Sequence, residues 1–336
     1  MKIGNMTIRY TSNPALQTIK TDWEGTPITA KGRYVNHEYP FVPEFSKVWK
    51  WKTGPAPQAA EKKADDRRLS VSTDTSFFSS RADGIVWLGH ASFYIRLSGR
   101  TFLIDPVYYS LPFVGEYVDV PNPIPAINQL DYLLISHDHR DHCDKKTVQE
   151  LTAKFPTVKI LTGLGLGDLL SGWVPDTVGV IEGGWYQRLV DTAECTVDYL
   201  PTRHWGRRGP FDTNRRLWGA FMIRIGSRSV YFGGDSGYGS HYRELTELYP
   251  AVDVALMGIG AYSPRWFMHP SHMAPEDAVV AFADTGARQL LPMHYGKYDL
   301  SDEPPGEPRQ LIKNLMEEQG TSDQLLLPVI GEPFYF

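Results

Sequence analysis

Residues 133–142 have the sequence LLISHDHRDH, in which an apolar run of strand type is followed at once by a cluster of polar side chains. His137 and His139 are two positions apart, so they share a face wherever the chain stays extended. Asp141 and His142 follow, which makes four metal-ligand side chains within six residues. A solvated polar turn would explain one such histidine but explains this cluster poorly. Because imidazole and carboxylate together suit Zn, Mn or Fe, the stretch predicts a metal site.

Three further donors follow the ends of other apolar runs, as His137 does. They are His204, Asp235 and His294. In open α/β sheets, binding sites form beyond the carboxyl ends of the strands, so we expect all of these side chains to meet there. Taken singly, His204 and His294 could be core histidines and Asp235 a turn former, but their repeated placement favours a shared site.

The donors suffice for two metal ions. The predicted metal ligands are His137, His139, Asp141, His142, His204, Asp235 and His294. If Asp235 bridges, each metal receives three protein ligands and this carboxylate, with a position left for water. Two metals about 3.5–4 Å apart can hold a hydroxide and clamp an in-line displacement. Cys143 is interpreted as a packed thiol.

From residue 83 onward, short β-rich runs alternate with a few helices, without a strict βαβ rhythm. The predicted strands are 85–88, 92–97, 101–104, 132–135, 159–161, 195–200, 218–225, 229–232, 254–257 and 289–291. The predicted helices are 145–154, 242–248, 275–284 and 308–318. Such a mixture favours two packed sheets with helices outside, a layered α/β arrangement.

The first 82 residues differ from the rest. Their apolar residues show no sustained period, aromatic residues are frequent between 34 and 51, and residues 54–83 are rich in Pro, Ala, Ser and charge. We therefore predict an irregular N-terminal arm and linker over 1–82, packed on a catalytic domain over 83–336. A free tail or a partner-binding arm is the alternative.

Composition excludes several classes of protein. The 336 residues are 42% hydrophobic and 22% charged, which is ordinary for a globular protein. The net charge of −5 gives no basic excess for a nucleic-acid partner. Two cysteines cannot form a disulfide framework. With no apolar leader and no run of about 18 apolar residues, we expect a cytoplasmic enzyme.

The spacing His137-x-His139-x-Asp141-His142, with distant His204, Asp235 and His294, resembles the metallo-β-lactamase superfamily. This resemblance spans about residues 84–336. It implies a four-layer αβ/βα sandwich with a dinuclear site at one edge. His139 stands where oxygen-reducing di-iron members usually have Glu, so the resemblance favours a zinc hydrolase with two zinc ions per chain, Mn or Fe being alternatives.

Dispersed motifs are similar to the N-acylphosphatidylethanolamine-hydrolysing phospholipase D family. They are Gly89-His90-Ala91, Leu103-Ile104-Asp105-Pro106, His204-Trp205, Leu217-Trp218-Gly219, Pro264-Arg265-Trp266-Phe267-Met268 and, in the arm, Trp49-Lys50-Trp51-Lys52. The resemblance implies that metal-bound hydroxide cleaves a phosphodiester of such a phospholipid. It implies catalytic roles for Asp141 and His272, with His272 near the substrate phosphate. Peripheral membrane contact and a homodimer are compatible with it.

Other side chains are assigned around this site. His90 and Asp105 are predicted to orient metal-bound histidines. Arg207 and Arg208 belong to an arginine-rich stretch that suits phosphate recognition, and Trp266 could line an acyl pocket. The alternatives are a solvated loop and core packing. A lactonase acting on sugar-phosphate or acyl lactones with the same metal site is the alternative function, and a di-iron redox or metal-sensing protein is a second.

Overall fold

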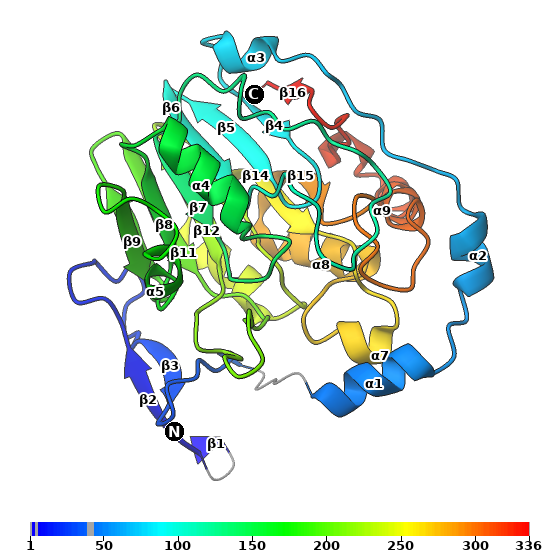
Figure 1. Ribbon diagram of the computed structural model, residues 1–336, viewed down its shortest axis with the longest axis horizontal. Helices are drawn as coiled ribbons and strands as arrows, with labels where there is room; N and C mark the ends of the chain where they lie inside the picture. The colour runs from blue at the N-terminus through cyan, green and yellow to red at the C-terminus, as the bar shows by residue number, and fades with distance from the viewer. Residues whose placement is uncertain (1, 4–5, 39–43, 336) are drawn as a thin grey trace.

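Two sheets form the body of the computed structural model, which describes residues 2–3, 6–38 and 44–335 (Figure 1). The first sheet has the strand order β16-β4-β5-β6-β7-β8-β9 and the second runs from β10 to β15. The first comprises β4 (Gly84–Trp87), β5 (Phe93–Leu97), β6 (Arg100–Ile104), β7 (Tyr132–Ile135), β8 (Lys159–Gly163), β9 (Gly179–Gly183) and β16 (Pro333–Phe334). The second comprises β10 (Gln187–Asp191), β11 (Cys195–Leu200), β12 (Ala220–Ile225), β13 (Arg228–Phe232), β14 (Val252–Gly258) and β15 (Ala287–Met293).

Successive side chains of a strand point to opposite faces of the sheet, and this divides the apolar core into two clusters. Ile85 and Trp87 of β4 pack into the apolar cluster that joins the two sheets. Val86, between them, packs into a second cluster with residues of α4 (Lys145–Lys154). Because successive side chains of a strand point to opposite faces, the first sheet is buried on both sides. The predicted layered α/β sandwich, with helices outside two sheets, is confirmed.

The helices cover the outer faces. Asp144 caps α4, its carboxylate accepting a hydrogen bond from the Thr147 backbone N–H at 2.9 Å. On the second sheet, α8 (Pro275–Thr285) packs against α9 (Glu307–Glu318). The other helices are α1 (Phe45–Thr53), α2 (Ala59–Ala64), α3 (Ser76–Ser79), α5 (Gly167–Leu170), α6 (Glu244–Leu248), α7 (Arg265–Met268) and the short η1 (Ser240–Tyr242) and η2 (Ser322–Gln324). Within the described residues, no helix is long and apolar enough to cross a membrane.

The predicted elements of the body are present with small shifts at their ends. The strand prediction at 132–135 and the helix prediction at 145–154 match β7 and α4 residue for residue. Strands β9 and β10 were not predicted. β9 contains two glycines and a glutamate and is mostly half-buried at a sheet edge, so its sequence lacks the apolar alternation of a covered strand.

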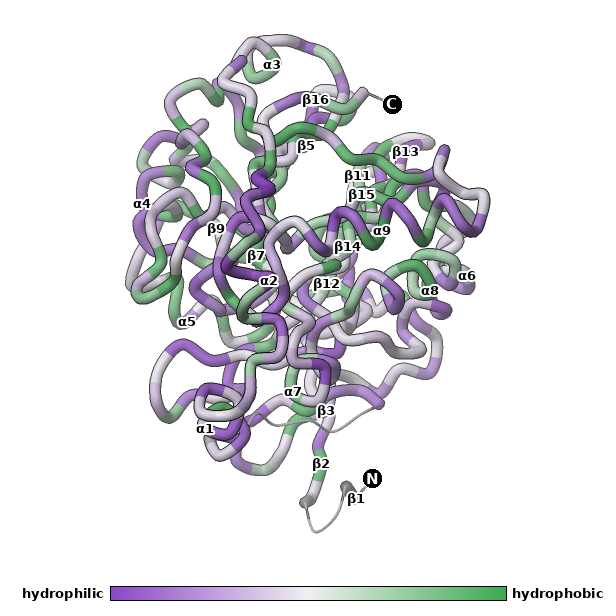
Figure 2. The backbone as a smooth tube through the Cα atoms, turned by 90° about the vertical axis from the view of Figure 1, so that its right-hand side faces the viewer, coloured by the Kyte–Doolittle hydropathy of each residue, from purple (hydrophilic) through white to green (hydrophobic). Residues whose placement is uncertain are grey.

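The arm is more regular than predicted. It contains a small sheet of β1 (Lys2–Ile3), β2 (Met6–Thr11) and β3 (Thr26–Thr29), followed by α1 and α2. The expectation of an irregular arm is therefore wrong for these segments, because their stability depends on strand pairing and on contacts with the body. Figure 2 shows that the chain around α2 is largely hydrophilic, unlike the strands of the body.

Aromatic residues do join the arm to the body. Trp23 lies edge-on to Tyr186 with ring centroids 4.7 Å apart, and Trp51 stacks on Phe267 at 5.2 Å. Of the aromatic stretch 34–51, residues 39–43 lie outside the described residues. The boundary between 82 and 83 stays a prediction.

Strand direction determines where the loops meet. Strands β6 to β9 are parallel to one another, and so are β13 to β15. The loops that leave their carboxyl ends therefore gather at one edge of each sheet. At this edge the two sheets together expose the segments that follow β4, β6, β7, β11, β13 and β15.

Candidate metal centre

The structure brings all seven predicted donors to this edge. His137 lies two residues beyond β7, Asp235 three residues beyond β13, and His294 directly after β15. His204 follows β11 by four residues. Most of these side chains are buried, whereas His139 and Asp141 are partly exposed. The donors fall into two clusters, within each of which the ligand atoms lie within 4.8 Å of one another.

The first cluster consists of His137, His139, His204 and Asp235. His139 Nδ1 lies 2.9 Å from His137 Nε2 and 3.1 Å from His204 Nε2. Asp235 Oδ2 lies 3.7 Å from His204 Nε2 and 4.0 Å from His137 Nε2. Three imidazole nitrogens and one carboxylate oxygen thus converge on one point, in a number that suits a four-coordinate metal.

The second cluster consists of three predicted donors, Asp141, His142 and His294, together with His90, which was predicted only to orient a ligand. Asp141 Oδ2 lies 3.6 Å from His142 Nε2 and 3.7 Å from His294 Nε2. Asp235 Oδ2 also approaches these two nitrogens, at 3.2 Å and 3.1 Å respectively. The same oxygen of Asp235 therefore lies between the two clusters, where a bridging ligand would have to be.

Unsatisfied polar atoms support the fit of a metal. Among the described residues, His142 Nε2, His294 Nε2 and Asp235 Oδ1 are buried without a hydrogen-bond partner. Leaving such an atom unsatisfied typically costs about 1–3 kcal/mol. His142 Nε2 and His294 Nε2 both face Asp235 Oδ2, so a cation there would satisfy them together. The donor set of imidazole and carboxylate suits Zn, Mn or Fe.

The charges of the acidic side chains in the site also favour a bound cation. Burial raises the pKa of Asp235, but His142 and His294 outweigh burial and hold its pKa well below the usual range. Burial lowers the pKa of His294, but Asp235 and Asp141 outweigh burial and raise it to about 9. By contrast, burial holds the pKa of His137 well below its usual value. The carboxylates of Asp235 and Asp141 thus require cations beside them, which protonated imidazoles or metal ions can supply.

Asp105 and Ser136 hold the histidines of both clusters from behind. Asp105 Oδ2 lies 2.8 Å from His142 Nδ1, and Asp105 Oδ1 accepts a hydrogen bond from the Ser136 backbone N–H at 2.7 Å. Ser136 Oγ lies 2.9 Å from His137 Nδ1. Hydrogen bonds at Nδ1 leave Nε2 facing the cluster, which is the arrangement that orients a metal-binding imidazole.

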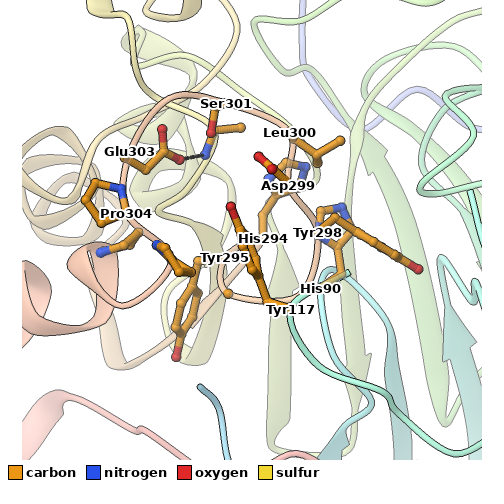
Figure 3. A pocket seen from close by; sticks show the side chains of 14 residues that line it. His90, Tyr117, His294, Tyr295, Tyr298, Asp299, Leu300, Ser301, Glu303 and Pro304 are labelled. Carbon is orange, nitrogen blue, oxygen red and sulfur yellow. Dashed lines mark hydrogen bonds between the residues drawn. The ribbon is translucent and has the colours of Figure 1, made fainter. Parts of the chain in front are cut away.

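His90 joins the second cluster through Asp141 and His294. Its Nε2 lies 3.1 Å from Asp141 Oδ2, and its ring centroid lies 4.0 Å from that of His294. Figure 3 shows His90 and His294 beside Tyr298 at a small cavity of about 20 Å³, roughly the space of one water molecule. His90, Asp105 and His294 all have positive φ, at 52°, 41° and 63°. Left-handed backbone costs non-glycine residues free energy and is concentrated at functional sites.

A larger cavity of about 230 Å³ opens onto the clusters. Its polar lining includes His139, Asp141, Asp235, His272 and His294, and its apolar lining includes Val48, Trp51, Trp205, Phe267 and Met268. His272 Nδ1 lies 3.9 Å from Asp235 Oδ2, and burial lowers the pKa of His272 to about 4. His272 is therefore a neutral imidazole beside both clusters.

The predicted substrate-binding residues lie elsewhere. Arg208 donates hydrogen bonds to the carbonyls of Asp138 and Cys143, so its guanidinium holds the histidine-rich loop. Arg207 is exposed and donates to the Gly209 carbonyl at 2.9 Å. Arg207, Arg208 and Trp266 are not among the described residues that line the larger cavity. Their predicted role in substrate binding stays a prediction.

The N-terminal arm contributes residues to the site that were not predicted from the sequence. Val48 and Trp51 of α1 line the cavity, and the Asn36 side chain bonds to the backbone of His204. The repeat of Trp and Lys at 49–52 was a signal for α1, although it gave no location. Nothing in the sequence around Asn36 distinguishes it from an ordinary polar residue.

Comparison with known proteins identifies the family. A model described as the Beta-lactamase superfamily domain matches residues 100–295. The chain is 32% identical over 274 residues to N-acyl-phosphatidylethanolamine-hydrolyzing phospholipase D 1 of Caenorhabditis elegans, covering 77% of each chain. It is 30% identical over 230 residues to a metal-dependent hydrolase of Caldivirga maquilingensis, covering 68% of this chain and 89% of that one.

A solved structure shows the same fold at lower identity. It is the metallo hydrolase Igni18 from Ignicoccus hospitalis, with a TM-score of 0.58 and 20% identity over 76% of this chain and 99% of that one. The family match covers more than half of the chain and includes all seven predicted donors. The chain therefore belongs to the β-lactamase superfamily and is a metal-dependent hydrolase.

Proposed function

We propose that this hydrolase cleaves a phosphodiester bond of an N-acylphosphatidylethanolamine-like phospholipid, with two metal ions, mostly zinc, held by the seven donors. The observation that carries the proposal is the larger cavity, whose lining combines residues of both clusters with an apolar wall. The relative from Caenorhabditis elegans, whose name gives that substrate, supports the choice of phospholipid. Two zinc ions would supply Lewis acidity and lower the pKa of a water molecule toward neutrality.

Asp235 and Asp141 have distinct tasks in this proposal. Asp235 Oδ2 is within 4.0 Å of nitrogens from five histidines, namely four predicted ligands and His272, so it would bridge the two sites. Asp141 faces only the second cluster, where His90 holds its carboxylate at 3.1 Å. Asp141 would therefore complete that cluster alone and keep its remaining oxygen toward the cavity.

His272 is surplus as a ligand and is proposed to act on the substrate. Its ring lies 5.1 Å from that of His204 and 5.2 Å from that of His294, so it lies beside both clusters at the cavity surface. A neutral imidazole there can donate a hydrogen bond to a phosphate oxygen, and it can give a proton to the leaving oxygen once it has itself taken one up. Acid–base help of this kind typically contributes about 10²–10⁴-fold in rate.

The arm and α7 would hold the acyl chain. Trp51 stacks on Phe267, and its indole N–H donates to Asp302 at 2.7 Å, which fixes the ring against the cavity. Val48 and Met268 extend the same apolar lining. Burying one methylene contributes about 0.8 kcal/mol, so several methylenes along this wall would bind a long chain in preference to a short one.

The helices α1 and α7, which contribute to the cavity lining, also carry exposed tryptophans that suit a lipid surface. Trp49 and Trp266 are 64% and 50% exposed, although tryptophan is usually covered. Lys50 Nζ lies 5.0 Å from the Trp266 ring, and Lys47 and Lys52 share helix α1 with Trp49. Exposed indoles beside lysines match the composition of segments that lie in a membrane interface. We include peripheral membrane contact through α1 and α7 in the proposed function.

One observation favours a lactonase as the second candidate. Within the described residues, no arginine or lysine lines the cavity, so a phosphate group would rely on the metals and His272 alone. A lactone carries no such negative charge at the reacting group. A cavity of this polarity would therefore accept an acyl lactone as well.

A substrate panel tests the proposal. Zinc-loaded protein is assayed on an N-acylphosphatidylethanolamine, a generic phosphodiester, a phosphomonoester and acyl lactones. We expect the phosphodiesters to be cleaved fastest and a long acyl chain to increase kcat/KM. Trp51→Ala should remove the chain-length preference, whereas Trp23→Ala, which removes an arm tryptophan packed on Tyr186, should retain it. Turnover of lactones alone would show that the second candidate is correct.

A further inference from the structure

The candidate ligand His204 lies in the loop between β11, which ends at Leu200, and β12, which begins at Ala220. Outside these strands, a single antiparallel bridge between Arg203 and Gly237 pairs the backbone beside it. Ligands such as His137 and His294 follow their strands within one or two residues. The loop therefore needs another source of rigidity if the His204 imidazole is to keep its position.

The side chain of Asn36, in the N-terminal arm, supplies it. Asn36 Nδ2 donates to the His204 carbonyl at 2.8 Å, and the His204 backbone N–H donates to Asn36 Oδ1 at 3.1 Å. One amide group thus pairs with both backbone polar groups of the same residue, as a neighbouring strand would. Asn36 is 2% exposed and His204 is fully buried, so water does not compete for these bonds.

The imidazole of His204 is held at a third point. Its Nδ1 lies 3.0 Å from the Ser271 carbonyl oxygen, which selects the form with hydrogen at Nδ1. Nε2 is then left as a lone pair facing His139 and Asp235. With the backbone fixed by Asn36 and the ring fixed by Ser271, the direction of the Nε2 lone pair is determined.

The arm itself is locked to the same loop beside Asn36. The Tyr34 backbone N–H donates to the Asn214 carbonyl at 2.7 Å, and Asn214 Nδ2 donates back to the Tyr34 carbonyl at 3.3 Å. Asn214 Oδ1 in turn accepts from the Gly206 N–H at 3.2 Å. The arm and the loop therefore form a reciprocal set of buried hydrogen bonds, at whose centre Asn36 contacts the ligand.

We propose that Asn36 is a positioning residue of the metal centre, which sets the metal affinity of the cluster of His137, His139 and His204 through the backbone of His204. The N-terminal arm is then part of the metal site and not only a cover over it. This inference rests on the metal centre and is independent of the phospholipid substrate. Residues that orient metal ligands from outside typically change metal affinity by about 10–100-fold when replaced.

Asn36→Asp is the sharpest variant. It keeps the size of the side chain and the acceptor for the His204 N–H, but it replaces the donor with an oxygen that faces the His204 carbonyl. Arg33→Ala is the matched control, because Arg33 donates to the carbonyls of Phe211 and Thr213 and so joins the same arm to the same loop without touching His204. Asn36→Ala removes both bonds.

The measurement is a zinc titration of metal-stripped protein against a chromophoric chelator. For Asn36→Asp we expect one of the two zinc affinities to fall by about 10–100-fold and the other to stay within about twofold. Excess zinc should restore turnover in Asn36→Asp. Arg33→Ala should bind both zinc ions with wild-type affinity. Thermal unfolding without zinc shows whether each variant is folded before the titration.

Several outcomes would overturn the inference. Wild-type zinc affinities in Asn36→Asp would show that His204 does not depend on Asn36. An equal loss of affinity in Arg33→Ala, or failure of both Asn36 variants to fold, would show that the contact serves only the scaffold. Because the titration contains no substrate, failure of the phospholipid proposal would leave this result unchanged.

Discussion

The histidine-rich loop at 133–142 and the arm segment at 33–53 reach the same metal centre by different means. The loop presents side chains whose chemistry identifies them, namely imidazoles and carboxylates that follow a buried strand. The arm presents an amide that holds a backbone and a helix that forms a wall. A site is therefore recognisable in sequence through its donors, whereas its supports are ordinary residues placed by the fold.

The two regions also differ in what holds them. Besides its hydrogen bonds to Asp105 and Arg208, the loop has local ones, since the Cys143 N–H donates to the His139 carbonyl at 2.9 Å and Asp144 caps α4 directly afterwards. The arm is held by distant partners, among them Glu244 of α6, which binds Lys20 at 2.7 Å and Tyr186. We therefore expect substitutions in the loop to abolish hydrolysis. Substitutions in the arm should weaken its attachment to the body and change metal affinity or substrate binding only in part.

The largest effect is expected at the carboxylate that joins both clusters. Asp235→Ala should lower the occupancy of both metal sites and reduce turnover by about 10⁴-fold or more, because each metal contributes several kcal/mol to the rate. Elemental analysis of the purified protein should find close to two metals, mostly zinc, in the wild type. Asp284→Ala, at a carboxylate that pairs with Arg243 on the surface, should keep both. A single tightly held metal that survives Asp235→Ala would contradict the dinuclear site.

The second-largest effect is expected at His272, whose replacement should lower turnover without removing metal. His272→Ala should keep two metals and normal folding but lose about 10²–10⁴-fold in turnover, because the substrate loses a proton donor. Rates and metal content are measured on the same preparation. His269→Ala, three residues away and outside the cavity lining, is the control and should retain activity. Loss of a metal in His272→Ala would show that His272 is a metal ligand. An unchanged turnover rate would show that His272 has no catalytic role.

The attachment of the arm to the body should weaken at acidic pH. Burial raises the pKa of Glu244, but His37, Lys20 and Tyr186 outweigh burial and lower the pKa from 4.5 to about 2. The stability that Glu244 contributes is therefore present above about pH 4.5 and is lost as the pH falls toward about 2, with an upper limit of about 3 kcal/mol. Limited proteolysis of the arm across this range, read beside tryptophan fluorescence, measures the loss.

Glu244→Gln makes the same test at neutral pH. It should expose the arm to protease at pH 7 and flatten the acid transition, because the charge that pairs with Lys20 is gone. Glu247→Gln, on the exposed side of α6, should behave as the wild type. An unchanged acid transition in Glu244→Gln would show that other groups hold the arm.

The smallest effect is expected at Trp49, an exposed residue of α1. Trp49→Ala should weaken binding to phospholipid vesicles by about fivefold, as expected for the loss of roughly 1 kcal/mol of indole burial in the interface. Hydrolysis of a short soluble diester should not change. Tyr335→Ala is the control, because Tyr335 is also 57% exposed but lies near β16, at the far end of the molecule from α1 (Figure 1). Equal vesicle binding by Trp49→Ala would place the lipid contact elsewhere.

Sequence by itself determined the parts of this protein that are local. The run 132–135 and the helix 145–154 were predicted because apolar content, an Asp cap and the polar loop between them are neighbours in the chain. The seven donors were predicted because each carries metal-binding chemistry and each follows a strand. The layered architecture followed from the mixture of strands and helices.

Tertiary structure decided what depends on pairing between distant segments. Asn36 meets His204 across 168 positions, and the arm strands form because partners lie beside them. Arg208, expected to face substrate, bonds to loop carbonyls that no local pattern places near it. A hydrogen bond to a backbone group requires only a polar side chain of the right length, which many residues offer. Position in the fold, and not residue type, therefore selects the one that supports the site.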